Sequence, residues 1–319
     1  MKIETVCVLG GTGFVGQHLI NRLYQDGKQV RVITRHRERH RELLVLPNVE
    51  VVEASAHDPE ALRAQFEGMD AVINLVGILN PAGRRAGGFQ KAHVELAGKV
   101  IEACQQAGVR RLLHMSALHA DSQKGPSEYL RSKGEAEDLV FEKAGDVAVT
   151  SFRPSVTFGP GDSFFNRFAG LLQRLPCSFP LVRPDARFAP VYVGDVVDAF
   201  ASALEDESTI GQRINLCGPR TYTLRELVEY TRELTGQRNI IIGLPNWLAA
   251  IQARIMEFVP GKPLTRDNLK SMKVDSVCPE GTVAQPTTIE AVVPYYLGGK
   301  NLRSKYHRFR RQAGRKGQV

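Results

Sequence analysis

A glycine-rich turn close to the start of the chain constrains the fold more than any other feature. Residues 6–9 are apolar and β-prone, the turn Gly10-Gly11-Thr12-Gly13-Phe14-Val15-Gly16 follows at once, and residues 17–25 have a helical pattern. Strand, turn and helix in this order are the context that a phosphate-binding fingerprint requires. Glycines at these spacings permit a tight turn, let the backbone approach a pyrophosphate and allow close helix–strand packing. We therefore predict a nucleotide site with the candidate contacts Gly10, Thr12, Gly13, Phe14, Val15 and Gly16.

Strand-like and helix-like segments then alternate through the first half of the chain. Strands are predicted near 3–9, 29–34, 49–53, 70–76, 110–116 and 148–153, and helices near 14–26, 38–45, 59–67, 88–107 and 127–144. This alternation predicts an α/β fold with a Rossmann-type, doubly wound parallel sheet. We expect a nucleotide-binding domain at 1–155, a small C-terminal substrate or partner lobe at 156–297 with excursions back to the sheet, and a tail at 298–319.

Composition indicates a soluble globular protein, because 43% of the 319 residues are hydrophobic and 24% are charged. No apolar run approaches the ~20 residues of a membrane span. The first predicted strand starts at once, so we expect no signal peptide and a cytoplasmic location, with peripheral contact to the inner face of the membrane as an extension. The five cysteines are scattered without a CxxC pair or a histidine cluster, so we expect reduced thiols and no metal site.

The net charge of +8 comes from the C-terminal segment. Residues 300–319 hold eight of the 42 lysines and arginines and no acid, and the other 34 basic residues balance the 34 acids. We expect this tail to be disordered. It can contact an anionic membrane surface, RNA or an acidic protein, or it can simply aid solubility. No aromatic-rich platform accompanies it, which argues against nucleic acid.

The end of the second predicted strand bears on the choice of dinucleotide. NAD-preferring sites carry an acid there, whereas this strand ends in Thr34-Arg35, and an arginine can pair with a 2′-phosphate. This favours NADP(H), with NAD(H) as the alternative, unless Arg35 merely belongs to an exposed loop. Asp58 can contact the adenine or cap the next helix. Asn74, Val76 and Gly77 lie where the chain should pass the cofactor.

A tyrosine and a lysine four residues apart are the candidate catalytic pair. The spacing of Tyr129 and Lys133 places both on one face of a helix. The lysine can lower the pKa of the tyrosine and hold a cofactor ribose, and the tyrosine can exchange a proton with a carbonyl or alcohol. Such a pair is common on exposed helices, but here it follows the fifth strand of a nucleotide-binding sheet.

With these motifs the chain resembles the short-chain dehydrogenase/reductase superfamily in its extended or atypical branch. The motifs that match are Gly10-x-x-Gly13-x-x-Gly16, Asn74-Leu75-Val76-Gly77, the strand 112–116, Tyr129-x-x-x-Lys133, residues 153–161 and residues 190–196. Residues 158–168 and 264–268 make it most similar to the nucleotide-binding accessory subunit of respiratory complex I and its bacterial relatives. The resemblance covers roughly residues 3–275 and implies a bound nicotinamide nucleotide.

One departure from the family pattern concerns the hydroxyl that holds the substrate oxygen beside the tyrosine. The resemblance places it at Ala117, and Ser116 supplies it only if the strand end is displaced by one residue. Loss of such a donor typically lowers the catalytic rate by about 100-fold or more. Two hypotheses follow. One is an oxidoreductase or epimerase-like enzyme for a small carbonyl, isoprenoid or quinone-like substrate. The other is a non-catalytic accessory protein that docks on a respiratory or membrane-surface partner.

Two further features have ordinary structural interpretations. Residues 246–258 form an amphipathic pattern with Trp247, Ile251, Ile255 and Phe258 on one stripe. Such a stripe favours a helix that covers the core, with an isoprenoid or quinone pocket and a membrane surface as alternatives. His93, on the helix after the fourth strand, is expected to be packed or exposed, although it can also approach the cofactor.

Overall fold

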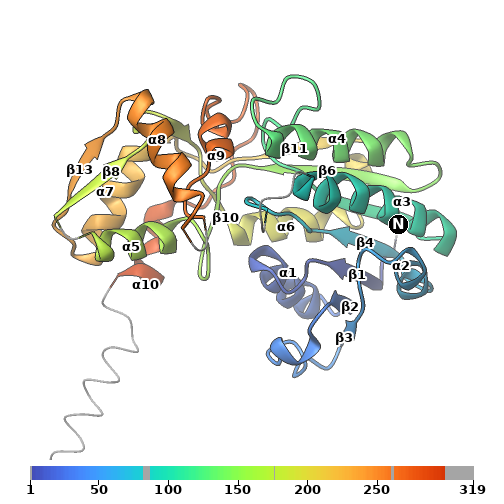
Figure 1. Cartoon of the computed structure of the whole chain (residues 1–319). Helices are drawn as coiled ribbons and strands as arrows, with labels where there is room; N and C mark the ends of the chain where they lie inside the picture. The colour runs from blue at the N-terminus through green and yellow to red at the C-terminus, as the bar shows by residue number, and fades with distance from the viewer. Residues whose placement is uncertain (1, 82–86, 176, 260–261, 299–319) are drawn as a thin grey trace, which may run out of the picture.

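The central element is a seven-stranded parallel sheet with the strand order β11-β6-β5-β4-β1-β2-β3. The computed structural model describes residues 2–81, 87–175, 177–259 and 262–298. The strands of the sheet are β1 (Thr5–Leu9), β2 (Gln29–Thr34), β3 (Val49–Glu53), β4 (Ala71–Asn74), β5 (Arg111–Met115), β6 (Ala148–Pro154) and β11 (Arg213–Leu216). The order reverses between β1 and β4, and doubly wound folds bind their ligands at the carboxyl ends of the strands that flank such a reversal. The predicted doubly wound α/β fold is confirmed (Figure 1).

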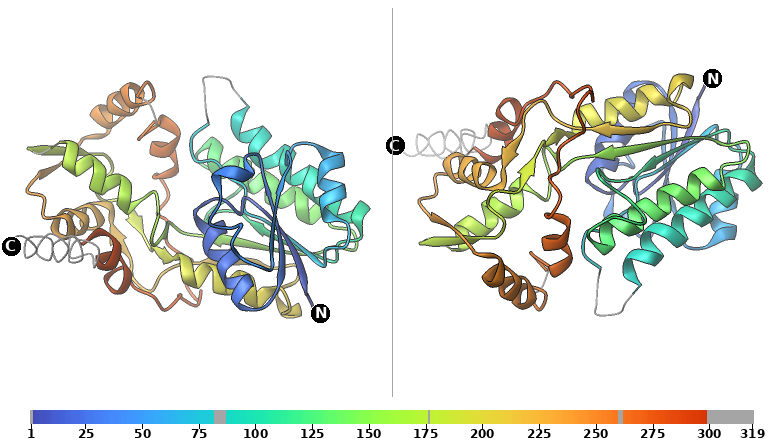
Figure 2. Two further views of the ribbon diagram at one scale, coloured as in Figure 1. Left: turned by 90° about the horizontal axis from the view of Figure 1, so that it is seen from below. Right: turned by 90° about the horizontal axis from the view of Figure 1, so that it is seen from above.

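Helices cover both faces of this sheet (Figure 2). One layer holds α1 (Phe14–Gln25) and α6 (Val193–Ala203); the other holds α2 (Pro59–Phe66), α3 (Leu96–Ala107) and α4 (Glu128–Glu142). The alternation of side chains along β1 explains the two layers. Val6 and Val8 join the core under α1, whereas Cys7 and Leu9 join the core under α2 and α3.

Two of the predicted helices differ from the structure. The helix expected near 38–45 is wrong, because only a 3₁₀ turn, η1 (Arg37–Arg39), forms there. Half of the residues of this segment are charged and Leu43 is its one fully buried apolar side chain, so a helix would bury little apolar surface. The helix expected near 88–107 begins as a π-helical segment, η2 (Gln90–Glu95), before α3. Short π-helical segments of this kind often occur at functional sites.

The remaining elements form a smaller lobe, drawn at the left of Figure 1. Its strands are β7 (Thr157–Phe158), β8 (Ser178–Leu181), β9 (Arg187–Phe188), β10 (Val191–Tyr192), β12 (Tyr222–Thr223) and β13 (Ile240–Gly243). Its helices are α5 (Phe165–Arg174), α7 (Leu224–Thr235), α8 (Asn246–Met256), α9 (Arg266–Ser271) and α10 (Ile289–Leu297). Between β10 and β12 the chain returns to the sheet as α6, the turn η3 (Glu207–Thr209) and β11.

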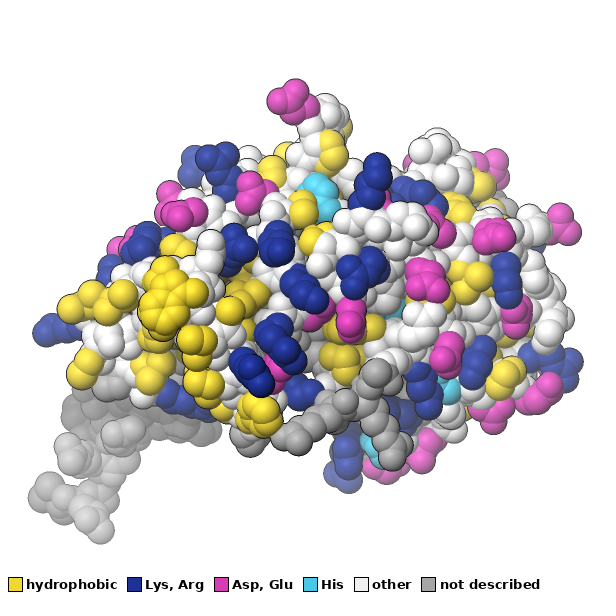
Figure 3. All heavy atoms as spheres, turned by 45° about the horizontal axis from the view of Figure 1, so that its top comes forward, with side chains coloured by type: hydrophobic (Ala, Val, Ile, Leu, Met, Phe, Trp, Pro, Cys, Tyr) yellow, Lys and Arg dark blue, Asp and Glu magenta, His cyan; other side chains and the backbone are white. Residues whose placement is uncertain are grey.

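The amphipathic stripe of α8 does not cover the core of this lobe, so the expectation of a core-covering helix is wrong. Trp247, Ile251, Ile255 and Phe258 are all at least half exposed. The physical reason is that α8 packs its alanine side on the protein, which leaves its large side chains outside (Figure 3). Within the described residues, no helix is both long and apolar enough to span a membrane.

A disulfide joins Cys217, directly after β11, to Cys278 in the segment between α9 and α10. The expectation of reduced thiols is therefore wrong for this pair. The two cysteines are 61 residues apart in sequence, and only the fold brings their Cα atoms to 6.0 Å. No spacing pattern could indicate that contact. Cys7 and Cys104 are free and buried, and Cys177 is free and exposed.

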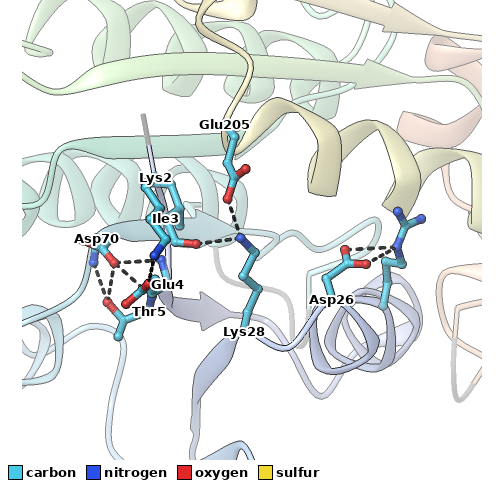
Figure 4. A network of polar contacts seen from close by, with 9 residues as sticks. Lys2, Ile3, Glu4, Thr5, Asp26, Lys28, Asp70 and Glu205 are labelled. Carbon is cyan, nitrogen blue, oxygen red and sulfur yellow. Dashed lines mark hydrogen bonds and ion pairs between the residues drawn. The ribbon is translucent and has the colours of Figure 1, made fainter.

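Polar networks close the sheet at the amino ends of its strands (Figure 4). Asp70, which precedes β4, accepts hydrogen bonds from the backbone N–H and the hydroxyl of Thr5, each at 3.0 Å. Lys28 donates to the carbonyl oxygen of Ile3 at 2.6 Å and to Glu205 at 2.5 Å. These contacts tie the start of β1 to β4 and to the end of α6.

A second contact at this edge is made by Arg111, whose side chain is almost completely buried. Its guanidinium donates to the hydroxyls of Thr150 and Thr209, each at 2.7 Å, and to the carbonyl oxygen of Ala203 at 2.8 Å. A buried charge is tolerable when its donors are satisfied in this way. The amino ends of β5 and β6 are thereby fixed to η3 and to the end of α6.

Candidate nucleotide and proton-transfer site

The glycine-rich turn leaves the start of α1 open to a ligand. Gly10 has a φ of +76°, and its carbonyl oxygen accepts the N–H of Gly13 at 3.0 Å. Gly13 precedes α1 without a side-chain cap, and the first turn of α1 has no acidic residue. The first N–H groups of a helix need an acceptor, and an anion satisfies them and the positive end of the helix dipole. The turn therefore fits a pyrophosphate.

The three glycines of the fingerprint serve different purposes. A Cβ at Gly16 would lie 2.4 Å from the carbonyl oxygen of Gly10, and a Cβ at Gly10 would lie 3.0 Å from the carbonyl carbon of Leu75. These two glycines allow close packing within the protein. A Cβ at Gly13 would meet a single atom, the Gly10 oxygen, at 3.3 Å. Packing within the protein therefore hardly requires a glycine at position 13. A glycine at this position fits the close approach of a ligand to the backbone.

The other residues expected around the turn lie on its exposed side and beside the lobe. Thr12 and Val15 are half-buried. Phe14 stacks edge-on against His18, with 5.5 Å between ring centroids, and His18 also contacts the carbonyl oxygen of Pro160 at 3.2 Å. A loop that enters the lobe therefore passes over the start of α1.

Arg35 and Asp58 both lie at the carboxyl end of the sheet and both are exposed. Arg35 directly follows β2, and its guanidinium makes no hydrogen bond or ion pair with the residues that the structure describes. Asp58 caps α2, because its Oδ1 accepts the N–H of Glu60 at 3.1 Å and the N–H of Ala61 at 3.4 Å. Asp58 thus has the helix-capping role, one of the two that were considered for it. Its second carboxylate oxygen has no partner among the described residues.

The segment after β4 lies at the strand reversal and contacts Lys133. The side-chain oxygen of buried Asn74 accepts the N–H of Val76 at 3.1 Å, and its amide contacts the ring of His114 at 3.4 Å. Gly77 lies against the ammonium of Lys133, since a Cβ there would be 2.9 Å from that nitrogen. The structure therefore brings the segment Asn74 to Gly77 together with Lys133.

Lys133 is buried and its ammonium lies between the ends of β4 and β5. Its Nζ donates to the carbonyl oxygen of Met115 at 2.9 Å and to that of Val76 at 3.4 Å. Burial lowers the pKa of Lys133 to about 8, although the carboxylate of Glu137 acts in the opposite direction. A lysine held at this place can reach a ligand that lies over the ends of both strands.

His93, on the π-helical segment, is packed and hydrogen-bonded rather than open to a ligand. Its Nε2 accepts the N–H of Ile78 at 3.1 Å, so Nδ1 carries the proton and donates to Ser132 at 2.8 Å. Burial, followed by the charges of Lys133 and His114, lowers the pKa of His93 to about 3. The neutral ring thus fixes the segment after β4 against α4.

Tyr129 is half-buried and packs against the small cluster of Ala117, Ala120 and Leu130. Its ring also contacts the rings of Phe89 and His93. Burial raises the pKa of Tyr129 to about 12. The expectation that Lys133 lowers this pKa is wrong here, because the lysine ammonium is directed at the two backbone carbonyls. The tyrosine is therefore a neutral phenol, which can donate a proton.

Two buried polar atoms near the carboxyl end of β5 have no hydrogen-bond partner among the described residues. They are the Oγ of Ser116 and the Nε2 of His114. Burial, followed by the charge of Lys133, lowers the pKa of His114 to about 3, so its ring is neutral. Unpaired buried polar groups in a native fold call for an explanation, and a bound ligand is one. Ser116 is thus the hydroxyl at this strand end, with Ala117 beside the tyrosine.

Sequence reasoning missed one residue that positions the site. Asp267, at the start of α9, accepts the N–H groups of Glu128 and Tyr129 at the start of α4. Ser271 of α9 also contacts Ser127, with 2.8 Å between the two hydroxyl oxygens. Residues 264–268 stood out as a family motif, but no local pattern indicates a contact across this span of chain.

Comparisons with known proteins agree with this geometry. A model of NAD(P)H-binding domains matches residues 10–158, and a model of the 3-beta hydroxysteroid dehydrogenase/isomerase family matches residues 119–222. The NADH dehydrogenase (ubiquinone) 1 alpha subcomplex subunit 9 of Mus musculus is 30% identical over 296 residues, which cover 89% of this chain and 77% of the relative. The chain belongs to the complex I subunit 9 family of short-chain dehydrogenase/reductase proteins. Its match to the model of NAD(P)H-binding domains supports binding of a nicotinamide nucleotide.

The chain is also similar to proteins with other names. The ceramide reductase of Caulobacter vibrioides is 30% identical over 246 residues, which cover 76% of this chain and 74% of the relative. Among solved structures, MoeE5 in complex with UDP-glucuronic acid and NAD superposes with a TM-score of 0.62 at 22% identity, over 75% of this chain and 85% of that one. The last comparison shows the shared fold.

Proposed function

We propose that the protein is an NADP(H)-dependent oxidoreductase that acts on a carbonyl or alcohol group. The observation that carries this proposal is that Lys133 contacts the carboxyl end of β5, with Tyr129 one helical turn before it on α4. A small carbonyl, isoprenoid or quinone-like compound is the substrate class. The name of the Caulobacter relative, a ceramide reductase, supports a carbonyl on a lipid-like molecule.

Each residue of the site has a separate role in the proposed reaction. The bound nucleotide supplies or accepts the hydride. Tyr129, neutral because burial raises its pKa to about 12, donates the proton to the carbonyl oxygen in the reducing direction. Lys133, at the ends of β4 and β5, would hold the nucleotide, and the Oγ of Ser116, which has no partner among the described residues, would offer a further hydrogen bond.

The preference for NADP(H) over NAD(H) rests on Arg35. Its guanidinium is exposed after the end of β2 and pairs with none of the residues that the structure describes, so it can pair with a 2′-phosphate. Losing such a charge-assisted contact costs about 1.5–3 kcal/mol, so Arg35→Ala should weaken NADPH binding by about tenfold or more and leave NADH binding unchanged. Arg39→Ala, an exposed arginine of the same loop, is the control. Equal losses for both nucleotides would contradict the assignment.

A second candidate is a non-catalytic accessory or assembly protein that holds its nucleotide as part of the fold. It is favoured by Ala117 beside the tyrosine and by the complex I names of the relatives. A resident ligand stabilises a protein without turnover. In this version the protein docks on a respiratory partner or, through its basic tail, on an anionic membrane surface. A cytoplasmic location with peripheral contact to the inner face of the membrane belongs to this proposal.

Two substitutions separate the candidates. Tyr129→Phe should abolish carbonyl reduction while nucleotide binding persists, and Ala117→Ser should raise kcat/KM by about tenfold or more by restoring a hydroxyl beside the tyrosine. Native mass spectrometry of the purified protein shows which nucleotide is retained. No turnover in any variant, together with a tightly held nucleotide, would leave the accessory role.

A further inference from the structure

Helix α8 has its large apolar side chains on the outside. Trp247, Ile251 and Ile255 are 65%, 50% and 59% exposed, whereas the buried residues of α8 are Ala249 and Ala253. A helix that covers a core has the reverse arrangement. Clustered exposed apolar side chains of this size mark an interaction surface rather than a random feature of the protein exterior.

A cation lies within this apolar face. Arg254 is three residues after Ile251, so helical spacing puts both on the same side of α8, and Arg254 is exposed. We use the name α8 face for Trp247, Ile251, Arg254 and Ile255 of α8 together with Phe258 in the turn that follows the helix. A long basic side chain amid apolar ones is typical of a helix that lies in a membrane interface, where the charge reaches the headgroups.

The surroundings of the α8 face are basic. Residues 246–274 contain five basic and two acidic residues. Both acids are occupied, since Glu257 pairs with Arg266 and Asp267 accepts backbone N–H groups of α4. Lys270 and Lys273 are exposed. In Figure 3 the hydrophobic side chains at the left of the view lie next to a group of lysines and arginines.

We propose that the α8 face docks on an anionic phospholipid bilayer, with α8 lying in the interface plane. The 11 residues of α8 span about 16 Å, too short to cross a ~30 Å hydrocarbon core. Exposed basic residues favour anionic headgroups over a second copy of the chain, because a twofold contact would bring the same cations together. The inference stands apart from the oxidoreductase proposal.

The docking surface is physically connected to the site. Helix α8 packs on α9, and α9 caps α4, the helix that carries Tyr129 and Lys133. A bilayer under α8 would therefore lie close to the segment that fixes the start of α4. This contact gives the lobe a fixed orientation on the membrane.

Trp247 is the only tryptophan in the chain, so its fluorescence reports on α8 alone. The full-length protein is mixed with vesicles of phosphatidylcholine and phosphatidylglycerol, or of phosphatidylcholine alone. We expect a blue shift, quenching by brominated lipid and co-sedimentation with the anionic vesicles. Ile255→Asp should weaken this binding by about tenfold or more. Val283→Asp, a control at an 83% exposed apolar residue of the same lobe, should bind normally.

Three results would overturn the proposal. The first is an unchanged Trp247 spectrum with anionic vesicles. The second is vesicle binding that survives Ile255→Asp and disappears when the basic residues of 300–319 are replaced, which would assign the contact to the tail. The third is a concentration-dependent dimer that Ile255→Asp dissociates, with no vesicle binding, which would assign the face to a second copy. Nucleotide binding by Ile255→Asp confirms that the variant is folded.

Discussion

The backbone N–H of Tyr129 donates a 3.1 Å hydrogen bond to Oδ2 of Asp267, 138 residues further along the chain. Oδ1 of the same carboxylate accepts the N–H of Glu128 at 2.8 Å, and Ser127 accepts the N–H of Leu130 at 3.1 Å. The first three N–H groups of α4 are thus all satisfied, two of them by the lobe. The position of the tyrosine depends on a carboxylate that belongs to another part of the fold.

Replacement of Asp267 should therefore affect both stability and the site. Asp267→Ala leaves two N–H groups without their acceptor, and loss of a helix cap typically costs about 1–2 kcal/mol. We expect the free energy of unfolding in urea to fall by this amount and proton transfer by Tyr129 to slow. Asp185→Ala, at an exposed aspartate of the same lobe, is the control. An unchanged unfolding curve for Asp267→Ala would show that the cap contributes nothing.

Gly13→Ala should separate nucleotide binding from folding. The added Cβ meets a single protein atom at 3.3 Å, so the fold tolerates it, but it occupies the side from which a pyrophosphate approaches. Losing one charge-assisted hydrogen bond costs about 1.5–3 kcal/mol, so calorimetry should show NADPH binding weakened by about tenfold or more. Gly170→Ala, where the Cβ meets nothing within 4 Å, should bind normally. Wild-type affinity in Gly13→Ala would place the phosphates elsewhere.

Acid should destabilise the protein through two buried histidines. The pKa values of His93 and His114 are lowered to about 3 in the folded protein, from 6.5 when unperturbed. Unfolding therefore takes up protons, and the stabilisation present above pH 6.5 is lost as the pH falls toward 3. The slope should be on the order of 1 kcal/mol per histidine per pH unit.

Urea unfolding between pH 7.5 and pH 4.5 tests this slope. His114→Gln should remove the uptake of about one proton and flatten the dependence on pH. His36→Gln, at an exposed histidine after β2, should leave it as it is. If wild-type protein and His114→Gln lose stability in parallel, other groups carry the acid effect.

The disulfide should be a measurable part of the stability. Closing a loop of this length restricts the unfolded chain, which corresponds to about 4 kcal/mol in the chain-entropy description. Reduction with dithiothreitol, or Cys278→Ser, should lower the free energy of unfolding by about 2–4 kcal/mol. Cys177→Ser, at an exposed free thiol, serves as the control. A wild-type curve that reductant does not shift would show that Cys217 and Cys278 are unpaired in solution.

Sequence predicted best what is local. The glycine turn, the six strands of the first half and the spacing of Tyr129 and Lys133 all depend on residues close together in the chain, and the structure contains them. The sequence also indicated that alanine stands at position 117, where the family pattern has a hydroxyl residue, because this position is found by counting from the end of a strand. These features follow from backbone sterics and from side-chain periodicity.

What sequence could not predict depends on distant contacts. The cap of Asp267 on Tyr129 and the bond between Cys217 and Cys278 have no local signature. The outward orientation of α8 was also missed, because periodicity identifies an apolar stripe but not whether the stripe faces the protein or the exterior. That choice depends on which neighbouring helices have surface left to cover.

The parallel strands carry satisfied polar groups at one end and unsatisfied ones at the other. At the amino end Arg111 donates to Thr150, Thr209 and the carbonyl of Ala203. At the carboxyl end Ser116 and His114 each have a buried polar atom without a partner in the part of the chain that the structure describes. Rigidity and reactivity are thus separated along the direction of the strands. Substitutions that raise stability can therefore be placed at the amino ends of the strands. Substitutions that change substrate preference can be placed at the carboxyl ends, and neither set reverses the effect of the other.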